Sequence, residues 1–342
     1  MLGFDIGIDL GTANTRVIVR QKIVLKEASA VAMDAETMRP IAYGNEARRM
    51  VGRTHKKIKT VLPIQRGFIA DYEAAEVMLK YYLRKVCGNQ MFKPRVMVCM
   101  PSRIPNVQRR SLMKVLSHAG ARRVCLIESP VAAAIGAGVD FSTPHGAIVV
   151  DVGAGVTDVA VLSMGGLAVW DSLKIASQDI DDAIIRYARR EYNMLIGAST
   201  AEHVKKTVAT LAPGNLEIAV SVKGRNLFSG LPQTFEMTAA ELKPAILEPV
   251  DQIVSGIQSV LERTPPELAG DIFTDGIILT GNGSLLSGFA DYLSGRLNAP
   301  VHPVSDPDSC VVKGTGVALR NLDLLKNGDY QFNTLQDIVV DY

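Results

Sequence analysis

The sequence predicts an α/β fold built from two similar lobes, and three observations support this prediction. The chain has 342 residues, and at about 150 residues per domain this length suggests two domains. Apolar strand-like runs alternate with helix-like stretches, as in α/β proteins. An apolar strand that ends in aspartate and continues into a glycine turn and a second strand occurs twice, near Asp9 and near Asp151. We interpret this repeat as an internal duplication of two lobes.

The first lobe begins with a strand at Asp5–Asp9 and a hairpin around Gln21, formed by Arg16–Arg20 and Lys22–Leu25. Asp71 can cap a helix through about Val86, because apolar residues recur there at helical spacing. The further elements that we expect in this lobe are a strand at Arg95–Met100, a helix at Gln108–Ala119 and a strand at Arg123–Ile127.

The second lobe repeats this order with a strand at Ala147–Asp151 and a hairpin formed by Val159–Leu162 and Leu167–Trp170. A clean apolar stripe predicts an amphipathic helix; it consists of Val250, Ile253, Val254, Ile257, Val260 and Leu261. A last strand, Gly276–Leu279, continues into a third glycine turn.

Composition is that of an ordinary globular protein, with 47% hydrophobic and 21% charged residues. The net charge of +2 argues against a strongly basic nucleic-acid binder and against an acidic disordered chain. The longest uncharged apolar run, Ser129 to Val139, is far shorter than the ~20 residues of a spanning helix. Met1 to Phe4 has no basic region, so we expect no signal peptide. The four cysteines form no C-x-x-C pair and are expected to be reduced in the cytoplasm; they are Cys87, Cys99, Cys125 and Cys310.

The first glycine turn, Asp9 to Thr15, has the chemistry of an anion site. Gly11 permits close backbone approach, and successive turn N–H groups can bind an anion. Thr12, Asn14 and Thr15 add side-chain donors. Asp9 can hold Mg²⁺ through water, because magnesium prefers carboxylate oxygens and keeps several waters. Taken alone, such a string is equally compatible with an ordinary hairpin turn.

The second turn, Asp151 to Asp158, repeats this chemistry, and the third, Leu279 to Ser284, allows a base and ribose to lie against backbone. Together the three turns predict a polyphosphate held from both sides, with Asp9 and Asp151 flanking one metal ion. The sequence contains no G-x-x-x-x-G-K-[ST] loop and no G-x-G-x-x-G after the first strand, so the alternative nucleotide folds have no support.

The three turns resemble the two phosphate motifs and the adenosine motif of the superfamily of actins, sugar kinases and heat-shock chaperone ATPases. The match is closer to the MreB/Mbl family of bacterial actins, along the strings 6–15, 67–80, 94–101, 126–138, 264–269 and 279–288. This resemblance implies an actin-like α/β fold of two lobes, each with a mixed-sheet core subdomain and a smaller inserted subdomain, around a nucleotide cleft. The implied boundaries are 1–30, 66–142 and 311–342 for subdomain IA, 31–65 for IB, 143–180 and 245–310 for IIA, and 181–244 for IIB.

The resemblance also implies a function. The family forms ATP-linked filaments at the inner face of the cytoplasmic membrane, where they organise cell-wall synthesis and rod shape. Implied partners are further copies of the chain in a head-to-tail polymer, possibly as paired antiparallel protofilaments, MreB-type paralogues, the membrane surface, and the membrane-bound proteins MreC, MreD and RodZ. Implied cofactors are ATP and Mg²⁺, and Asp9 and Asp151 are the implied metal-binding residues. The implied nucleotide-binding residues are Gly11, Thr12, Ala13, Asn14, Gly153, Ala154, Gly155, Asp181, Lys205, Thr207, Gly281, Asn282 and Gly283.

The chain departs from the family pattern at two positions that place the attacking water. Ser129 stands where the family has a glutamate, and Val156 stands where it has a threonine. A serine cannot act alone as a general base; before Pro130 it predicts a helix N-cap instead. Glu128 is expected to point elsewhere. We therefore expect the catalytic group of Ser129, Val156 and Asp151 to hydrolyse ATP slowly or not at all.

Other departures concern nucleotide affinity. The family's Gly-Gly near the ribose is Ala176-Ser177, its ribose-facing glutamate is Thr207, and the middle glycine of its adenosine turn is Asn282. We expect Asn282 to tolerate a left-handed backbone there.

Met91 and Phe92 form an apolar pair in a turn flanked by four cations, Arg84, Lys85, Lys93 and Arg95, which suits an anionic membrane surface. Leu2 and Phe4 can add apolar area. The alternative is that Phe92 covers the core beneath the loop. The basic stretch from Arg48 to Lys59 has no interleaved aromatic residues, so we expect a solvated face or filament contact and no nucleic-acid partner.

Two alternative functions stay open at this point. One is a sugar or acid kinase of the same superfamily, although nothing in 71–101 indicates a sugar site. The other is a regulatory pseudo-ATPase that co-assembles with an active paralogue, which the substitutions at Ser129, Val156 and Thr207 would suit.

Overall fold

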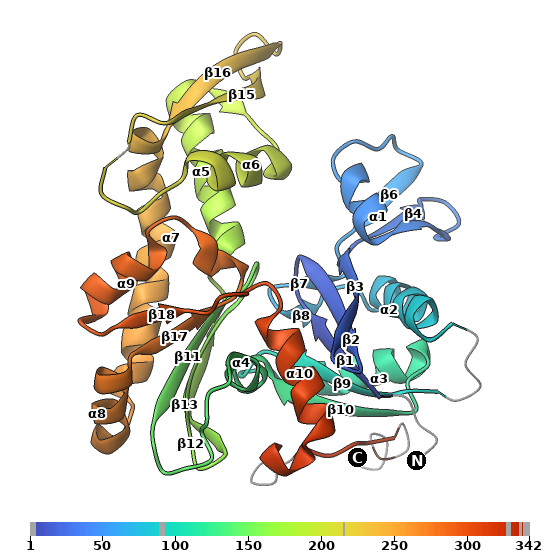
Figure 1. Cartoon of the computed structure of the whole chain (residues 1–342). Coiled ribbons are helices and arrows are strands. Elements are labelled where there is room, and N and C mark those ends of the chain that lie inside the picture. Colours follow the sequence, from blue (N-terminus) through green and yellow to red (C-terminus); the bar gives the residue numbers. More distant parts are fainter. Residues whose placement is uncertain (1–4, 89–92, 215, 326–329, 335–336, 338–342) are drawn as a thin grey trace.

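Two five-stranded sheets of identical topology form the centres of two lobes (Figure 1). The computed structural model describes residues 5–88, 93–214, 216–325, 330–334 and 337. The lobe I sheet has the order β10-β9-β1-β2-β3 and the lobe II sheet the order β13-β12-β11-β17-β18. In both, three antiparallel strands are followed by two parallel ones. The predicted duplication is therefore confirmed.

The predicted strands are present, with small changes at their ends. Lobe I contains β1 (Asp5–Leu10), β2 (Asn14–Val19), β3 (Lys22–Ala28), β9 (Arg95–Met100) and β10 (Arg123–Glu128). Lobe II contains β11 (Ala147–Val152), β12 (Thr157–Ser163), β13 (Gly166–Leu173), β17 (Ile277–Thr280) and β18 (Val301–Pro303). The β2–β3 hairpin turns at Arg20 and Gln21, both of which have positive φ.

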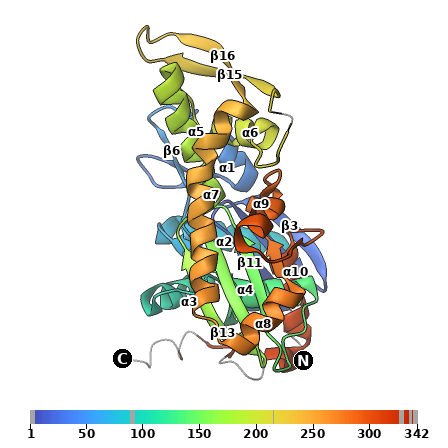
Figure 2. The same ribbon diagram turned by 90° about the vertical axis from the view of Figure 1, so that its left-hand side faces the viewer.

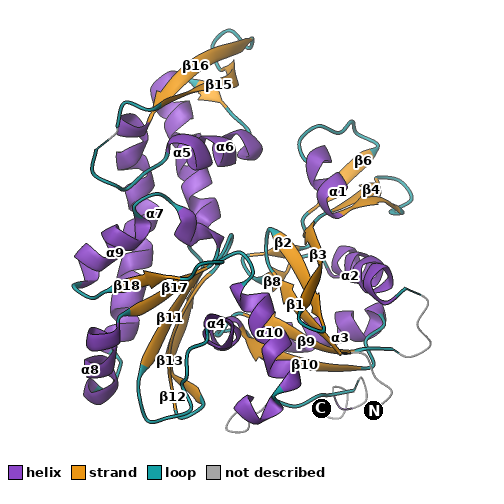
Figure 3. Ribbon diagram, in the orientation of Figure 1, coloured by secondary structure: helices purple, strands orange, loops and turns teal. Residues whose placement is uncertain are grey.

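Helices α2 (Tyr72–Cys87) and α3 (Asn106–Ala119) cover one face of the lobe I sheet (Figure 3). Asp71 caps α2 as predicted, because its carboxylate accepts the Ala74 N–H at 2.9 Å. Helix α3 begins two residues before the predicted Gln108, after Pro105. Strand β9 is buried on both faces, so that Val96 and Val98 contact this helical layer while Met97 and Cys99 face the other side.

Two helices fill the space between the sheets: α4 (Ser129–Ala137) and α10 (Cys310–Arg320). Their backbones approach closely, because a Cβ on Gly136 would collide with the carbonyl of Cys310, and a Cβ on Gly314 with that of Ala132. Strands of both lobes contribute to this core, including Met97 of β9 and Val149 of β11. The two lobes therefore share one apolar layer.

A small sheet is inserted into each lobe, above its large sheet in Figure 1. In lobe I it has the order β5-β4-β6, and its elements are β4 (Val31–Asp34), β5 (Pro40–Tyr43), α1 (Gly44–Met50) and β6 (Ile58–Val61). In lobe II it has the order β14-β15-β16, and its elements are β14 (Met194–Leu195), α6 (Ala198–Val208), β15 (Ala219–Asn226) and β16 (Pro232–Thr238). A short hairpin, β7 (Ile64–Gln65) and β8 (Phe68–Ile69), follows the first insert.

Helix α7 (Ala239–Glu262) connects the lobe II insert to the base of that lobe, as the side view in Figure 2 shows. Its first turn is closed by a capping box, in which Thr238 and Glu241 bind each other's backbone N–H groups. The predicted stripe is buried from Val250 to Val260. The remaining helices are α5 (Ser177–Tyr192), α8 (Pro266–Asp275) and α9 (Phe289–Leu297), with the 3₁₀ turns η1 (Asn282–Leu285) and η2 (Leu322–Leu325).

Within the described residues, no helix is both long and apolar enough to cross a membrane. All four cysteines are free thiols. The chain end adds one bridge to β10, where Asn333 and Val124 exchange backbone hydrogen bonds.

Candidate functional site

A cleft of about 1020 Å³ lies between the lobes and gathers the predicted nucleotide-site residues. They come from the β1–β2 turn, the β11–β12 turn, the β17–η1 turn, α4, α5 and α6. The predicted residues on its walls are Asp9, Gly11, Thr12, Ala13, Asn14, Ser129, Asp151, Gly153, Ala154, Gly155, Val156, Asp181, Lys205, Thr207, Gly281, Asn282 and Gly283. Residues spread over 275 positions in the sequence thus share one cavity.

The first two turns have the same backbone geometry. The N–H of Gly11 donates to the carbonyl of Asn14 at 3.0 Å, and the N–H of Gly153 donates to that of Val156 at 2.9 Å. The turns also approach each other, since a Cβ on Gly155 would lie 2.8 Å from the Thr12 hydroxyl oxygen. Paired turns of this kind leave backbone N–H groups on both walls for an anion.

Three carboxylates lie deep in the cleft: Asp9, Asp151 and Asp158. Burial, with the nearby charges of Asp158 and Asp9, raises the pKa of Asp151 to about 8. Burial also raises the pKa of Asp9, although Arg16 opposes the shift. Burial raises the pKa of Asp158 to about 6, against hydrogen bonds from Ser172 and Ser102. A cation bound here would favour the charged form of these carboxyls, because it would offset both their burial and their mutual repulsion.

The donor set fits Mg²⁺ held by few protein ligands. Among the described residues, no three or more His, Cys, Asp or Glu side chains gather at metal-ligand geometry. Magnesium usually keeps several waters and needs only one or two carboxylates with phosphate oxygens. Asp151 suits this role, because the described structure gives its carboxylate no ion pair. Asp9 is already paired, with Arg16 Nη1 at 3.0 Å.

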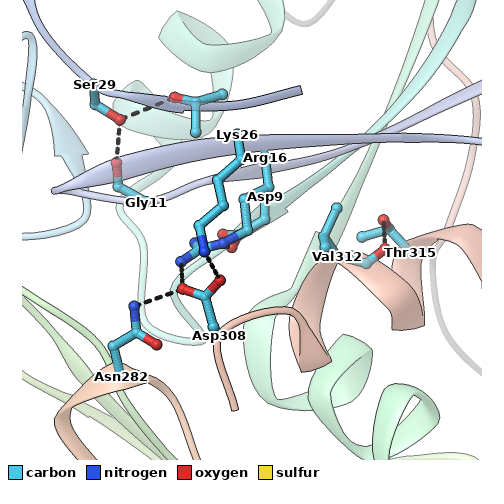
Figure 4. A network of polar contacts seen from close by, with 10 residues as sticks. Asp9, Gly11, Arg16, Lys26, Ser29, Asn282, Asp308, Val312 and Thr315 are labelled. Atoms are coloured by element: carbon cyan, nitrogen blue, oxygen red, sulfur yellow. Dashed lines mark hydrogen bonds and ion pairs between the residues drawn. The ribbon is translucent and has the colours of Figure 1, made fainter. Parts of the chain in front are cut away.

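A charged network that includes Arg16 was not predicted (Figure 4). Arg16 and Lys26 both donate to Asp308, and Asn282 donates to Asp308 Oδ1 at 2.7 Å. Burial would raise the pKa of Asp308, but these three donors outweigh it and hold the pKa far below its usual range. The sequence contains one indication of this network. Arg16 interrupts the apolar run of β2 and lies opposite Asp9 on the neighbouring strand β1.

Lys205 of α6 organises the lobe II wall. It forms an ion pair with Asp181 Oδ1 at 2.8 Å and donates to the hydroxyl and carbonyl of Ser177. Burial raises the pKa of Asp181 to about 6 against the effect of Lys205. Thr207 lines the cleft, but its hydroxyl donates back to the His203 carbonyl of its own helix. The hydroxyl of Ser177 therefore has a hydrogen-bond partner in Lys205.

Ser129 and Val156 line the cleft, whereas Glu128 does not. Glu128 accepts a hydrogen bond from Tyr330 at 2.8 Å and lies 3.8 Å from Arg109. It is thus engaged away from the predicted phosphate turns, as expected.

Three local predictions are wrong. Ser129 is not the N-cap of α4: Glu128 holds that position, and the Ser129 hydroxyl donates to the Met100 carbonyl at 3.1 Å. Thr15 does not face the cleft; adjacent strand residues point to opposite sides, and its hydroxyl is buried against Ser29. Positive φ in the third turn occurs at Gly281, whereas Asn282 starts the 3₁₀ turn.

The predicted membrane residues Met91, Phe92, Leu2 and Phe4 lie outside the described residues. Of the four cations around the Met-Phe pair, Lys85 binds Glu27 at 2.9 Å and Arg95 binds Asp5 at 2.6 Å. Arg84 and Lys93 are exposed.

Two further ion pairs join the lobes. Arg66 binds Asp179 at 2.8 Å, and Arg48 of the lobe I insert lies 3.6 Å from Glu202 of the lobe II insert. Arg48 and Glu202 both line the cleft. The sequence predicted a solvated face or filament contact for Arg48 and not this pair, because charge alone does not indicate a partner about 150 residues away.

Comparison with known proteins gives a consistent result. The family described as "MreB/Mbl protein" matches residues 3–327. The chain is 44% identical over 327 residues to the cell shape-determining protein Mbl of Bacillus subtilis, covering 95% of this chain and 98% of that one. It is 41% identical over 331 residues to the cell shape-determining protein MreB of Escherichia coli K12, covering 95% of each.

Solved structures agree in fold. The crystal structure of MreB5 of Spiroplasma citri bound to ADP has a TM-score of 0.90 and 36% identity, covering 96% of this chain and 99% of that one. The structure of the same protein bound to AMPPNP has a TM-score of 0.89 and 35% identity, covering 94% and 98%. The MamK double helical filament, at 20% identity and a TM-score of 0.79 over 93% of this chain and 98% of that one, shares the fold. The predicted actin-like fold is confirmed.

Proposed function

This chain belongs to the MreB/Mbl family of actin-like, cell shape-determining proteins, and from that premise we propose that it binds ATP with Mg²⁺ in the interlobe cleft and assembles into filaments. One observation supports the nucleotide site above others: three glycine turns from separate parts of the chain line a single cleft. The nucleotides named in the Spiroplasma structures, ADP and AMPPNP, support the same ligand class.

Each part of the cleft has a separate role in this proposal. The backbone N–H groups of the paired turns bind the phosphates, and the β17–η1 turn lies against the adenosine. Lys205, fixed by Asp181 and Ser177, supplies positive charge on the lobe II wall. Asp151 holds the metal through water, and bound Mg²⁺ would neutralise charge on the phosphates.

We further propose that hydrolysis is slow. Water placement and activation are a large part of what an NTPase contributes beyond charge neutralisation. Ser129 donates its hydroxyl to Met100 and Val156 has no hydroxyl, so neither supplies a base at the cleft wall. The filament would then be controlled by nucleotide binding more than by turnover.

A pair of glycine substitutions tests the nucleotide site. Gly155→Val places a side chain against Thr12 between the two turns, so we expect loss of ATP binding, measured by fluorescence of a labelled ATP, and loss of ATP-dependent pelleting. Gly166→Val is the matched control, because a Cβ there meets nothing within 4 Å. Failure of the unsubstituted protein to bind ATP contradicts the proposal. Pelleting that requires an added MreB paralogue supports the regulatory alternative instead.

We also propose that the filament lies on the inner face of the membrane, together with the cell-shape proteins MreC, MreD and RodZ. Met91 and Phe92, followed by the exposed Lys93, would insert into an anionic surface. Changing both residues to serine should abolish co-sedimentation with anionic vesicles without altering the melting temperature. Ile23→Ser/Val24→Ser removes a comparable exposed apolar pair on β3 and should leave binding intact. Equal binding by the Met91/Phe92 variant would exclude this loop as the membrane contact.

A further inference from the structure

Three charged residues, Asp9, Arg16 and Lys26, lie side by side on the neighbouring strands β1, β2 and β3 and line the cleft. Arg16 is the direct cross-strand neighbour of Asp9 on one side and of Lys26 on the other. Cross-strand neighbours lie on the same face with their side chains in reach of one another. The β1–β2–β3 register therefore fixes a guanidinium next to the carboxylate that the sequence assigns to magnesium.

This guanidinium is held on two sides. Arg16 is 6% exposed, its Nη1 lies 3.0 Å from Asp9 Oδ2, and its Nη2 donates to Asp308 (Figure 4). Asp308 stands in the loop between β18 and α10, and it also accepts from Asn282 of the β17–η1 turn. Arg16 Nε, by contrast, is buried without a hydrogen-bond partner. Two nitrogens of the Arg16 guanidinium are therefore bound, and the third has no partner. The fold fixes the position of this cation.

The pairing changes what Asp9 can do. A buried carboxylate needs a counter-charge, since an unpaired one is strongly destabilising. Arg16 supplies that charge without any metal. A magnesium ion approaching Asp9 would meet a guanidinium of the same sign that already occupies one carboxylate oxygen.

We propose that Arg16 is the resident counter-cation of Asp9, so that ATP binding by this chain depends only weakly on Mg²⁺. The inference rests on the proposed nucleotide function and concerns one wall of its site. Asp151, which has no such partner among the described residues, is then the carboxylate through which bound magnesium acts.

The experiment measures the dissociation constant of a fluorescently labelled ATP in excess Mg²⁺ and in excess EDTA. For the unsubstituted protein we expect the two constants to differ by less than about tenfold, which is about 1.4 kcal/mol. Arg16→Met leaves Asp9 unpaired beside the phosphates, so EDTA should weaken its binding at least about tenfold more than in the unsubstituted protein. Arg16→Lys keeps the charge and should resemble the unsubstituted protein.

Arg66→Met is the matched control. It removes another arginine that links the lobes, through Asp179, but it leaves Arg16, the partner of Asp9, in place. Its EDTA effect should equal that of the unsubstituted protein.

The outcomes separate this inference from the proposed function. Absence of ATP binding in both conditions contradicts the function itself. If the unsubstituted protein binds ATP and EDTA weakens that binding more than about tenfold, the role of Arg16 alone is overturned. This measurement does not require any variant to fold. Equal EDTA effects in Arg16→Met and the unsubstituted protein, or in Arg16→Lys and Arg16→Met, also overturn it.

Discussion

At the scale of single residues, the cleft shows how one substitution can change chemistry without changing shape. Val156 packs beside Gly67, close enough that a Cβ on Gly67 would lie 2.8 Å from its methyl group. Threonine has nearly the same volume but presents a hydroxyl. Ser129 likewise fits the start of α4 while offering no carboxylate. Both positions are therefore compatible with the fold, and under the proposed function neither provides a group that places the attacking water.

If hydrolysis is slow as proposed, adding a carboxylate and a hydroxyl at these two positions should raise turnover. Ser129→Glu/Val156→Thr is expected to raise phosphate release at least about a hundredfold, the size of effect seen when a general base or positioned donor is lost. The measurement is phosphate release from polymerised protein at saturating ATP.

Glu128→Gln is the control for this pair, because Glu128 binds Tyr330 outside the cleft. It should leave the rate unchanged. A double variant that binds ATP yet releases phosphate no faster would show that other groups limit hydrolysis.

At the scale of elements, helices α4 and α10 matter most, because their contact joins the cores of the two lobes. Sequence patterns predicted β1, β2, β9, β11 and the turns between them, since period-two apolar runs and glycine turns are local signals. The close helix contact was not predicted. It depends on two glycines, Gly136 and Gly314, which are 178 positions apart along the chain, and no local pattern encodes such a pairing.

A side chain larger than glycine at the contact between α4 and α10 should destabilise the fold. Gly314→Ala would drive a methyl group into the Ala132 carbonyl, so we expect a loss of about 1–3 kcal/mol in unfolding free energy, as for other overpacked cores. Urea denaturation measures it.

Gly295→Ala in α9 serves as the comparison, because its Cβ meets nothing within 4 Å. A helix-interior alanine there should be neutral or stabilising by up to about 1 kcal/mol. If both variants lose equal stability, close packing is not the cause.

A second element-scale prediction concerns His145, which ties the start of β11 to α8. Its ring lies 2.6 Å from Asp275 and 3.2 Å from Asp271, and the hydrogen bond to Asp275, followed by the charge of Asp271, raises the His145 pKa. A raised pKa in the folded state stabilises the protein fully below the unfolded value of about 6.5. That contribution is lost as the pH rises through the folded pKa.

His145→Gln should therefore lower the melting temperature more at about pH 5.5 than at about pH 9. His203→Gln is the control for loss of a histidine, because His203 is exposed on α6 and its side chain forms no ion pair among the described residues. A larger effect of His145→Gln at the higher pH would contradict the ion-pair account.

At the scale of the whole molecule, charges bridge the cleft at three levels: Arg16 with Asp308 at its floor, Arg66 with Asp179, and Arg48 with Glu202 between the inserts. The turns that form the candidate site could be predicted because each is a short string. The bridges could not, because each joins residues that only the assembled lobes bring together. The predicted turn residues thus line the cleft, whereas the ion pairs that join its two sides were not predicted.

The uppermost bridge should slow nucleotide release. Arg48 and Glu202 are about one-third exposed, and such pairs contribute about 0.2–1 kcal/mol. Arg48→Ala should therefore accelerate dissociation of labelled ATP by up to about fivefold, measured by stopped-flow chase.

Arg186→Ala removes an exposed pair with Glu248 on the lobe II surface and should not change the release rate. High salt should reproduce the Arg48→Ala effect in the unsubstituted protein, because exposed pairs are screened. An unchanged rate in both tests would show that the inserts do not gate the cleft.

The position of α10 has a consequence for synthesis. Lobe I begins at the first strand, yet the helix that seals its inner layer, Cys310–Arg320, is translated only after all of lobe II. A nascent chain that has emerged as far as α4 therefore exposes an apolar surface until Cys310–Arg320 has been translated. Chaperone capture during that interval, and aggregation of any product truncated before Cys310, are what this arrangement predicts.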